Sequence, residues 1–353
     1  MTRIIHVASG REWRGGQRQT WLLARELERL GVDQLLITQR GSELARRAQA
    51  DGVRVREVSW SMGLDPRAFW AVRSEARRGP AILHAHDGHA VTIARWASSS
   101  AAPWIATRRN ASPLGRPDSW RTAVRVVAIS EAVRVQLRRD GVAEDRIVVV
   151  PSGIDLAAIR ATGAEDLRTW ARVPNGGPLV VTVAALTPEK GLLTLIAAFA
   201  MVLKERDVRW VVIGDGPMRD QLRTSANDPS FQGKLVFPGF HPEPTRLLRD
   251  ADLFVLCSRS EGLGTSVLDA MALDLPVVAT DAGGLPELLA GGAGLSAPVD
   301  DPRAVATAVM RFLDDPDLRR RAIEAGRTTV ARYTVDAMAA GMRVVYDSVD
   351  ATR

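Results

Sequence analysis

The sequence predicts an α/β protein made of two doubly wound domains, each with a parallel sheet. The chain has 353 residues, which is more than one typical core accommodates and suits two domains of roughly 150–200 residues. Short apolar runs alternate with amphipathic segments along the chain, as in βα units whose strands are covered on both faces. The alternation restarts after a Pro/Gly cluster at 173–178, a breaker signal. We therefore expect a hinge near residues 155–175.

Continuous apolar runs mark the expected strands, and amphipathic segments mark the expected helices. The strands expected in the first half are 4–8, 34–38, 53–58, 81–84, 104–107, 124–129 and 147–150. Those expected in the second half are 179–183, 209–213, 234–237, 253–256 and 276–279. The expected helices are 17–30, 131–140, 192–204, 218–224, 244–249, 266–273 and 303–314. From residue 316 the chain reads as helical without strands, so we expect this tail to pack across the outside.

Composition indicates a globular protein with no membrane span. Hydrophobic residues make up 46% and charged residues 25% of the chain, and no stretch approaches the ~20 apolar residues that a spanning helix needs. The strand-like start at 3–8 argues against a secretory signal. The single cysteine, Cys257, excludes an intrachain disulfide and fits a reducing cytoplasm. We expect Cys257 to be buried as a small apolar residue.

Positive charge is concentrated in the first half of the chain. Residues 1–158 carry 25 Lys and Arg against 16 Asp and Glu, whereas residues 159–353 carry 22 against 25. Such a basic half suggests a face for an anionic partner: a nucleic acid, an acidic lipid surface or a phosphorylated acceptor. Alternatively, the 44 arginines among 47 basic residues reflect a compositional bias. Both interpretations stay open at this point.

The most informative segment is 258–271, which follows an apolar strand, turns through two glycines and enters a helix. Glycines allow a ligand to approach the backbone closely, and the free N–H groups of a helix start can hold a phosphate. We expect Glu261 to point at ligand hydroxyls such as those of a sugar, and Asp269 to accept from ribose hydroxyls. Alternatively, Ser266 and Asp269 form a capping box, in which Asp269 only supports the helix start.

Lys190 lies at a second strand-to-helix junction, within 181–191. It is one of three lysines in an arginine-rich chain, and a compact ammonium there can neutralise a diphosphate. The alternative is a solvated surface charge. That alternative is weakened because a cation near a helix N-terminus is unfavourable unless an anion joins it.

Three other junctions carry weaker signals. Residues 10–16 are glycine-rich and basic and end in Gly15 and Gly16, but they lack the G-x-G-x-x-G dinucleotide fingerprint. Gly214 and Gly216 lie in a strand-end turn, which is either a ligand loop or a plain turn. Residues 237–242 include Phe240 and His241, and they could present backbone groups to a nucleobase.

A cluster of histidines follows the expected strand 81–84. His84, His86 and His89 suggest a metal, but alternation along a strand separates neighbouring side chains, and no second cluster completes a site. We therefore predict no metal and expect His86 or Asp87 to act in the ligand cleft, with polar packing as the alternative. The chain also lacks a G-x-S-x-G elbow and a P-loop.

Taken in order, these segments resemble the retaining glycosyltransferases of family four, which have the GT-B fold. The similarity covers nearly the whole chain and is strongest from 124 to 289. The shared motifs are the glycine pair at 15–16, segments 128–131, 141–142 and 150–155, residues 184–186 and 190–191, the GDGP turn at 214–217 and the long motif from 258 to 287. Any one of these motifs is weak, whereas the ordered set is specific.

The resemblance implies two Rossmann-like domains facing a central cleft, with a C-terminal helix packing back toward the N-terminal domain. It implies an acceptor-side domain at 1–158, a nucleotide-sugar-binding domain at 159–335 and a crossing helix at 336–353. By resemblance, Lys190 would hold the diphosphate, and the catalytic candidates are Glu261, Lys190, His86 and Asp87. The further donor-site candidates are Gly15, Gly16, Ala185, Gly214, Gly216, Phe240, His241, Gly262, Leu263, Gly264, Thr265 and Asp269. No metal or other cofactor is implied.

The chain departs from the family pattern at several positions. The second glutamate of the E-x7-E pair is Asp269, the arginine that partners the lysine is Ala185, and a glycine after the AMA triplet is Asp274. A cleft histidine is replaced in the pair Arg108-Arg109. We hypothesise that Arg14, Arg108 or Arg109 supplies the missing charge to the diphosphate or to an anionic acceptor.

The sequence therefore predicts a retaining transferase that moves a sugar from a UDP- or GDP-sugar to a glycan, a glycolipid or a small molecule. We expect a cytoplasmic enzyme of cell-envelope polysaccharide synthesis, with peripheral contact to an anionic membrane and no nucleic-acid partner. The alternatives are a catalytically impaired nucleotide-sugar-binding subunit, suggested by Ala185 and Asp269, and a nucleotide-sugar epimerase.

Overall fold

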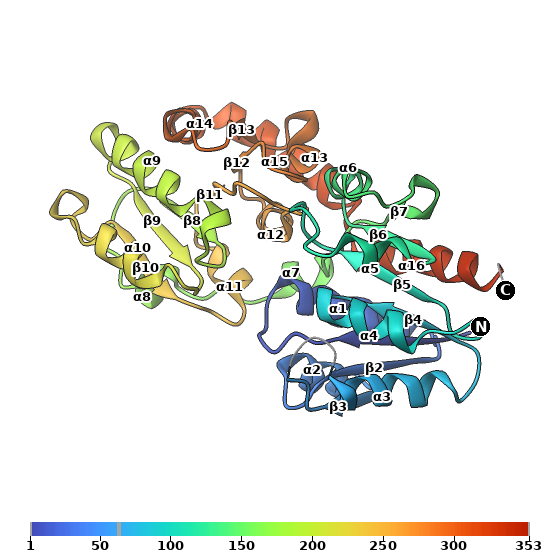
Figure 1. Ribbon diagram of the computed structural model, residues 1–353. Coiled ribbons are helices and arrows are strands. Elements are labelled where there is room, and N and C mark those ends of the chain that lie inside the picture. Colours follow the sequence, from blue (N-terminus) through green and yellow to red (C-terminus); the bar gives the residue numbers. More distant parts are fainter. Residues whose placement is uncertain (1, 62–64, 352–353) are drawn as a thin grey trace. The chain divides into compact units, whose positions relative to one another are not determined.

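The structure, a computed structural model, describes residues 2–61 and 65–351. The chain divides into two compact units. Unit 1 comprises Met1–Ile154 and Tyr333–Arg353, and unit 2 comprises Asp155–Arg332. Each unit contains one parallel sheet with its own helices (Figure 1), and each is described by itself.

Unit 1 is built on a seven-stranded parallel sheet in the order β3-β2-β1-β4-β5-β6-β7. Its strands are β1 (Arg3–Ala8), β2 (Gln34–Gln39), β3 (Val55–Val58), β4 (Ala81–Ala85), β5 (Trp104–Arg108), β6 (Arg125–Ala128) and β7 (Ile147–Val149). The order reverses between β1 and β4. In open parallel sheets, ligands bind beyond the carboxyl ends of the strands at such a switch point.

The helices of unit 1 cover both faces of its sheet. They are α1 (Gly15–Arg29), α2 (Glu43–Ala50), α3 (Pro66–Ala76), α4 (Gly88–Ala97), α5 (Pro117–Arg121), α6 (Glu131–Arg139), α16 (Val335–Asp350) and the 3₁₀ turn η1 (Glu144–Arg146). Right-handed crossovers put α1 and α2 on one face and α3 and α4 on the other. In agreement, α1 packs against α2 and α16, and α3 packs against α4.

The C-terminal helix α16 belongs to the core of unit 1. Its apolar residues share one cluster with Leu23 of α1 and with inward residues of the sheet such as Ile82 and Val127. The chain enters α16 through a backbone bridge between Ile154 and the segment at Thr334. The expectation that a final helix packs on the N-terminal domain is thus confirmed.

Unit 2 contains a six-stranded parallel sheet in the order β10-β9-β8-β11-β12-β13. Its strands are β8 (Leu179–Val183), β9 (Arg209–Ile213), β10 (Leu235–Gly239), β11 (Leu253–Leu256), β12 (Val277–Thr280) and β13 (Leu295–Ala297). Its α-helices are α7 (Leu156–Ala161), α8 (Leu167–Ala171), α9 (Leu192–Glu205), α10 (Arg219–Ala226), α11 (Pro244–Leu248), α12 (Thr265–Ala272), α13 (Leu285–Leu289), α14 (Pro302–Asp314) and α15 (Pro316–Val330). Its 3₁₀ turns are η2 (Pro188–Lys190), η3 (Pro229–Phe231) and η4 (Ala290–Gly292). Here the strand order reverses between β8 and β11.

The predicted alternation is confirmed, and every strand expected from the sequence is present within two residues of its expected ends. The short edge strand β13 and several helices, among them α2 to α4, were not expected individually. Cys257 is buried as expected, and burial raises the pKa of its thiol to about 12. Among the described residues, no helix is both long and apolar enough to cross a bilayer.

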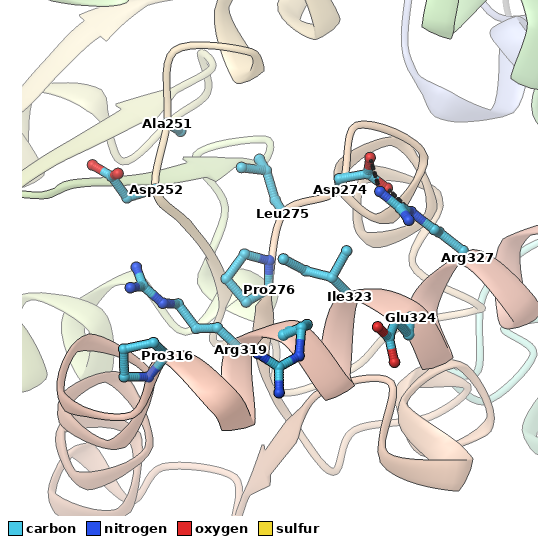
Figure 2. Close-up of a pocket in the computed structure, with 11 residues that line it drawn as sticks. Ala251, Asp252, Asp274, Leu275, Pro276, Pro316, Arg319, Ile323, Glu324 and Arg327 are labelled. Atoms are coloured by element: carbon cyan, nitrogen blue, oxygen red, sulfur yellow. Dashed lines mark hydrogen bonds and ion pairs between the residues drawn. The ribbon is translucent and has the colours of Figure 1, made fainter.

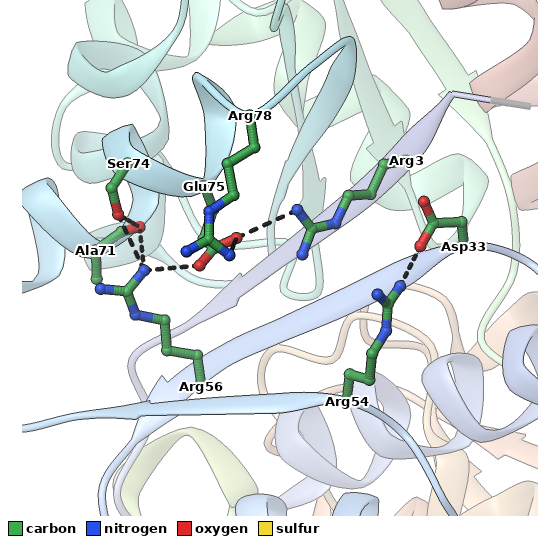
Figure 3. Close-up of polar contacts among 8 residues, drawn as sticks. All are labelled: Arg3, Asp33, Arg54, Arg56, Ala71, Ser74, Glu75 and Arg78. Atoms are coloured by element: carbon green, nitrogen blue, oxygen red, sulfur yellow. Dashed lines mark hydrogen bonds and ion pairs between the residues drawn. The ribbon is translucent and has the colours of Figure 1, made fainter.

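A buried carboxylate organises part of the arginine-rich surface of unit 1. Glu75 on α3 is only 4% exposed, and it receives N–H groups from Arg56 (2.8 Å), Arg78 (3.1 Å) and Arg3 (3.2 Å). Figure 3 shows the three guanidinium groups around this one carboxylate, beside a separate pair of Arg54 and Asp33. Glu75 thus connects α3 to strands β1 and β3.

Replacing Glu75 by glutamine is expected to lower the free energy of unfolding by about 2 kcal/mol, because three arginines lose the carboxylate that neutralises them. Denaturant unfolding measures this loss. The matched control is Asp118→Asn, since Asp118 pairs with Arg121 but is 84% exposed and should cost about 0.5 kcal/mol or less. Equal effects of the two substitutions would contradict the assignment.

Candidate functional site

The loops after β8 and β11 meet at the switch point of the unit 2 sheet. The loop after β8 contains η2 and ends at Lys190, and the loop after β11 contains Glu261 and leads into α12. The backbone N–H of Arg259 donates to the Glu189 carbonyl at 2.7 Å, so the two loops are joined directly. Adjacent central strands therefore place residues 71 positions apart in one site.

Lys190 and Glu261 form an ion pair at the centre of this edge. The Lys190 Nζ lies 2.6 Å from Glu261 Oε2, and the two side chains are 19% and 16% exposed. The Ser258 hydroxyl donates to the same carboxylate oxygen at 3.2 Å. Since both charges are mostly removed from water, their interaction is stronger than that of a surface pair. Within the described residues, the other Glu261 oxygen, Oε1, makes no hydrogen bond to the protein, so it can accept from a ligand.

Glycines allow these loops to pack backbone against backbone. Gly191 has φ +60°, and a side chain there would collide with the Cys257 carbonyl. Gly283 has φ +54°, and a side chain there would collide with the carbonyl of Glu261 itself. The Thr280 hydroxyl donates to the Ser258 carbonyl at 2.5 Å. The loop after β12 thus fixes the backbone that carries Glu261.

Gly283→Ala is expected to lower the free energy of unfolding by about 2–3 kcal/mol, because it combines an unfavourable φ with a backbone collision. It should also weaken ligand binding, since the Glu261 loop must move. Gly291→Ala is the matched control: Gly291 has a similar φ of +69° but open space around its Cα, so only about 1 kcal/mol is expected. Thermal and denaturant unfolding compare the two, and equal losses would refute the role of the collision.

The helix α12 begins without a side-chain cap. Its N-cap is Gly264, at φ +97°, and no acidic residue stands in its first turn. The first helix N–H groups, from Thr265 onward, are thus free of a side-chain acceptor on the N-cap and suit an anion. The capping-box alternative is wrong, because the helix starts at Thr265 and Ser266 is already inside it. Asp269 lies one turn further and is 4% exposed.

The remaining unit 2 candidates lie on neighbouring loops. Gly214 and Gly216 pack against the carbonyls of Ala184 and Leu186, where side chains would collide. The turn at these glycines therefore packs directly against the backbone of the Ala185 loop. Phe240 is 54% exposed just beyond β10. His241 contacts Trp170 edge-on and lies 3.5 Å from a Glu165 oxygen. Gly262 and Leu263 are buried in the Glu261 loop.

At the unit 1 switch point, Gly15 and Gly16 belong to the first turn of α1, which starts two residues before the expected helix. Neither glycine has a positive φ. The N-cap is Arg14, which makes no side-chain cap and pairs instead with Glu12 at 2.5 Å. The first turn of α1 also carries no acidic residue. Like α12, it offers free N–H groups to an anion.

Three histidines, His6, His84 and His86, gather at this switch point, contrary to the expectation that alternation separates the histidines of 84–89 and that no second group joins them. His89 is exposed and lies outside this cluster. His6 of β1 is the register partner of His84 of β4, and His86 lies two residues further on the same side. All three are buried, and their potential ligand atoms lie within 4.8 Å of one another. His6 joins the other two because β1 pairs with β4, which the sequence alone did not indicate.

Hydrogen bonds determine how these rings are protonated. Arg109, always a donor, gives N–H groups to the His86 carbonyl and to His86 Nδ1, both at 3.1 Å. His86 must then carry its proton on Nε2 and donate to His6 Nδ1 at 2.9 Å. His84 binds the Tyr346 hydroxyl through Nδ1 and Thr107 through Nε2. Both nitrogens of His84 and of His86 are therefore engaged.

Burial keeps this cluster neutral. It lowers the pKa of His6 to about 4 and that of His84 and His86 well below their ordinary value, with the neighbouring rings and Arg109 as smaller causes. Burial also lowers the pKa of Arg109 to about 10, which still leaves it charged at neutral pH. A single half-buried guanidinium thus stands beside three neutral imidazoles.

Asp87 and Arg108 complete the polar residues at this edge. The Asp87 carboxylate caps α4 through Ala90 N–H at 2.9 Å and accepts from the N–H and the hydroxyl of Ser9, both at 2.6 Å. Arg108 donates to the Ser112 carbonyl at 2.7 Å and lies over the ring of Trp120. Both side chains therefore have structural partners, which a ligand would have to share or replace.

The departure at Asp274 has a local structural basis. Asp274 has φ +62°, a conformation that favours glycine, and both its carboxylate oxygens accept from Arg327 at 2.7 Å. This pair borders an open pocket of about 450 Å³ between α15 and the loops before β11 and β12 (Figure 2). That pocket lies at the amino ends of the strands, away from Lys190 and Glu261. The pair with Arg327 thus stabilises Asp274 in its unusual backbone conformation, and it does so away from the Lys190–Glu261 pair.

Two family models match the chain. Residues 13–158 match the model described as Glycosyltransferase Family 4, and residues 165–329 match the one described as Glycosyl transferases group 1. The first range lies almost wholly in unit 1 and the second lies in unit 2.

Characterised relatives include several sugar transferases. The alpha-D-kanosaminyltransferase of Streptomyces kanamyceticus is 29% identical over 76% of this chain and 71% of the relative. The putative colanic acid biosynthesis glycosyltransferase WcaL of Escherichia coli K12 is 32% identical over 55% of this chain and 49% of the relative. The alpha-monoglucosyldiacylglycerol synthase of Streptococcus pneumoniae is 33% identical over 44% and 36%. The chain therefore spans half or less of the latter two proteins.

Solved structures share the architecture. Anabaena Alr3699/HepE, solved in complex with UDP and glucose, has a TM-score of 0.85 at 20% identity, with 99% of this chain and all of that chain covered. A glycosyltransferase from Rickettsia africae has a TM-score of 0.83 at 20% identity, over 99% and 98% of the two chains. At such identities the likeness establishes the fold, and the two family models add the class. The chain therefore has the GT-B fold, and each of its two units matches a glycosyltransferase family model.

Proposed function

We propose that this chain transfers a sugar from a UDP- or GDP-sugar to an acceptor hydroxyl, with unit 2 holding the donor. The observation that carries the proposal is the Lys190–Glu261 pair next to the uncapped start of α12. An ammonium and free helix N–H groups suit a diphosphate, and a carboxylate oxygen suits sugar hydroxyls. The UDP and glucose named for HepE support this ligand class.

In this proposal Lys190 and the N–H groups from Gly264 onward bind the diphosphate, and Glu261 orients the sugar. The buried Asp269 accepts from the ribose, and the exposed Phe240 with the neighbouring backbone contacts the base. Retention of configuration is carried over from the family resemblance, with the leaving diphosphate helping to deprotonate the acceptor. His86 and Asp87 remain catalytic candidates, and Arg14, Arg108 and Arg109 remain candidates for a further anionic group.

We also propose that the reaction needs no metal. Within the described part of the chain, the three-histidine cluster is a group that could hold an ion, but its ring nitrogens other than His6 Nε2 already bind one another, Thr107, Tyr346 and Arg109. An ion would have to break the bonds of His84 and His86 beside the charged Arg109 guanidinium, which repels it. Treatment with EDTA is therefore expected to leave turnover and thermal midpoint unchanged. A loss that Zn²⁺ or Mg²⁺ restores would refute this proposal.

For the acceptor we propose a glycan or a lipid-linked group of the cell envelope, handled in the cytoplasm. The support is indirect: the names of the relatives include colanic acid biosynthesis and a glucosyldiacylglycerol synthase, and the only cysteine is a buried free thiol, as is usual in a reducing compartment.

A thermal-shift series with UDP, GDP, ADP and their sugars tests the proposal. Ligands that bind only the folded state raise the thermal midpoint, so one nucleotide and its sugars should stabilise the chain. In Glu261→Gln, the nucleotide alone should still raise the midpoint, whereas the additional rise caused by the attached sugar should vanish. Silence toward all nucleotides would overturn the proposal. Because Ala185 removes a phosphate-binding arginine of the family, a donor-binding subunit without turnover is the second candidate. Stabilisation by a donor that is never consumed would select that candidate.

A further inference from the structure

Two tryptophans stand exposed on the outer helices of unit 1. Trp70 of α3 is 60% exposed and Trp96 of α4 is 62% exposed. The two helices pack side by side, and Arg73 of α3 donates to the carbonyls of Ala97 and Ser98 at the end of α4. Both helices return from the carboxyl ends of parallel strands, so they run in the same direction. Their outer sides therefore form one continuous surface, which carries both indoles.

The same surface is basic, because its carboxylates face inward. Residues 65–100 contain five arginines and three acidic residues, Asp65, Glu75 and Asp87. Asp65 is 3% exposed and pairs with Arg67 at 3.1 Å. Glu75 is buried under three guanidinium groups (Figure 3), and Asp87 caps α4. The exposed arginines on this side of α3 are Arg67, Arg77 and Arg78. We call the surface formed by Arg67, Trp70, Arg77, Arg78 and Trp96 the Trp face.

We propose that the Trp face docks the protein on an anionic lipid bilayer. Indole rings favour the boundary between headgroups and hydrocarbon, where one part of the ring is apolar and the N–H is hydrated. Arginines next to them are attracted to acidic headgroups, and each contributes separately. The ring of Phe69 lies edge-on to Trp70, with 5.3 Å between centroids, and adds apolar surface beside the exposed indole.

Lipid fits this surface better than a nucleic acid does. Single-stranded nucleic acids bind grooves in which cations follow the backbone and aromatic rings stack on successive bases. The Trp face is instead the outer side of two neighbouring helices, with its indoles on different helices. A planar, deformable bilayer can reach both indoles and the arginines at once. The proposal does not depend on sugar transfer.

Vesicle flotation with the full chain tests the docking. The probes are vesicles of phosphatidylcholine alone and of equal parts phosphatidylcholine and phosphatidylglycerol. We expect binding to the acidic vesicles, and a partition coefficient at least about tenfold lower for the double variant Trp70→Ala/Trp96→Ala. Arg77→Gln should lower it by about fivefold at low salt.

Matched controls distinguish binding through the Trp face from nonspecific binding to vesicles. Val344→Ala removes another exposed apolar side chain, 68% exposed on α16, and Arg303→Gln removes an exposed arginine of unit 2. Both should bind vesicles as the parent does. Since the substituted tryptophans are largely exposed, the double variant should keep its thermal midpoint and its nucleotide-induced shift. This readout distinguishes failure of the docking from failure of the proposed function.

Three results would overturn the inference. The first is absence of binding to acidic vesicles at low salt. The second is undiminished binding by the double tryptophan variant. The third is binding of a single-stranded oligonucleotide, lost in that variant, in place of vesicle binding, which would assign the face to nucleic acid.

Discussion

Lys190→Ala is expected to lower donor affinity and turnover together, reducing kcat/KM by about a hundredfold to a thousandfold. The ammonium lies 2.6 Å from Glu261 and is 19% exposed, so its charge acts on a bound diphosphate with little screening by water. Because Ala185 stands where the family has a second cation, no arginine at that position can compensate. The diphosphate would then face the Glu261 carboxylate without a neutralising charge.

The chain offers a matched control in Lys204, another of its three lysines, at the end of α9 and away from the Glu261 loop. Lys204→Ala should leave kcat/KM unchanged. Lys190→Arg should restore part of the donor affinity, since it returns the charge with a different shape. In the double variant Lys190→Ala/Glu261→Gln, the two losses should not add, because the groups contact each other. Parental kcat/KM in Lys190→Ala would contradict the assignment.

The two sheets could be predicted from the sequence because their central strands are buried on both faces. A run such as Val278 with its neighbours in β12 is continuously apolar, and so it can be recognised without tertiary information. The strand β13 has a half-buried residue, an exposed one and a buried one over only three positions, so it carries no such signal. Some helix starts were less predictable: α1 begins at Gly15, two residues before its expected start, after an N-cap Arg14 whose side chain makes no cap.

The unit 2 candidates could be found individually, but not their contacts. Lys190 and Glu261 each follow a predicted strand, yet their pairing depends on β8 and β11 being neighbours in a sheet whose order reverses there. The histidine cluster depends on strand order in the same way, since His6 reaches His84 only because β1 pairs with β4. The hydrogen bonds of Arg109 to His86 could not be predicted, because they depend on how the histidine ring is oriented in the folded chain.

Acidification from pH 7 to pH 5 is expected to destabilise unit 1 through the His6, His84 and His86 cluster. Burial depresses the pKa of each ring in the folded protein, to about 4 for His6. In the unfolded chain these rings take up protons below about pH 6.5. Between these values the unfolded state binds more protons, so the free energy of unfolding falls as the pH falls. Each ring contributes a slope of up to about 1.4 kcal/mol per pH unit, and three contribute up to about 4 kcal/mol per unit.

Carboxylates with depressed pKa values do not obscure this window. Arg46 and Arg47 hold the pKa of Glu43 at about 2, so the stability that this group contributes is lost only as the pH falls below about 4.5. The slope between pH 6.5 and pH 5 therefore reports mainly on histidines. Denaturant unfolding across this range measures it, and histidine ring NMR signals should show three rings that stay neutral at pH 5. His6→Asn should reduce the slope by the contribution of one proton, whereas the exposed His89→Asn should not. A flat stability profile between pH 6.5 and pH 5 would show that the cluster accepts protons in the folded state, which would contradict the assignment of three neutral rings.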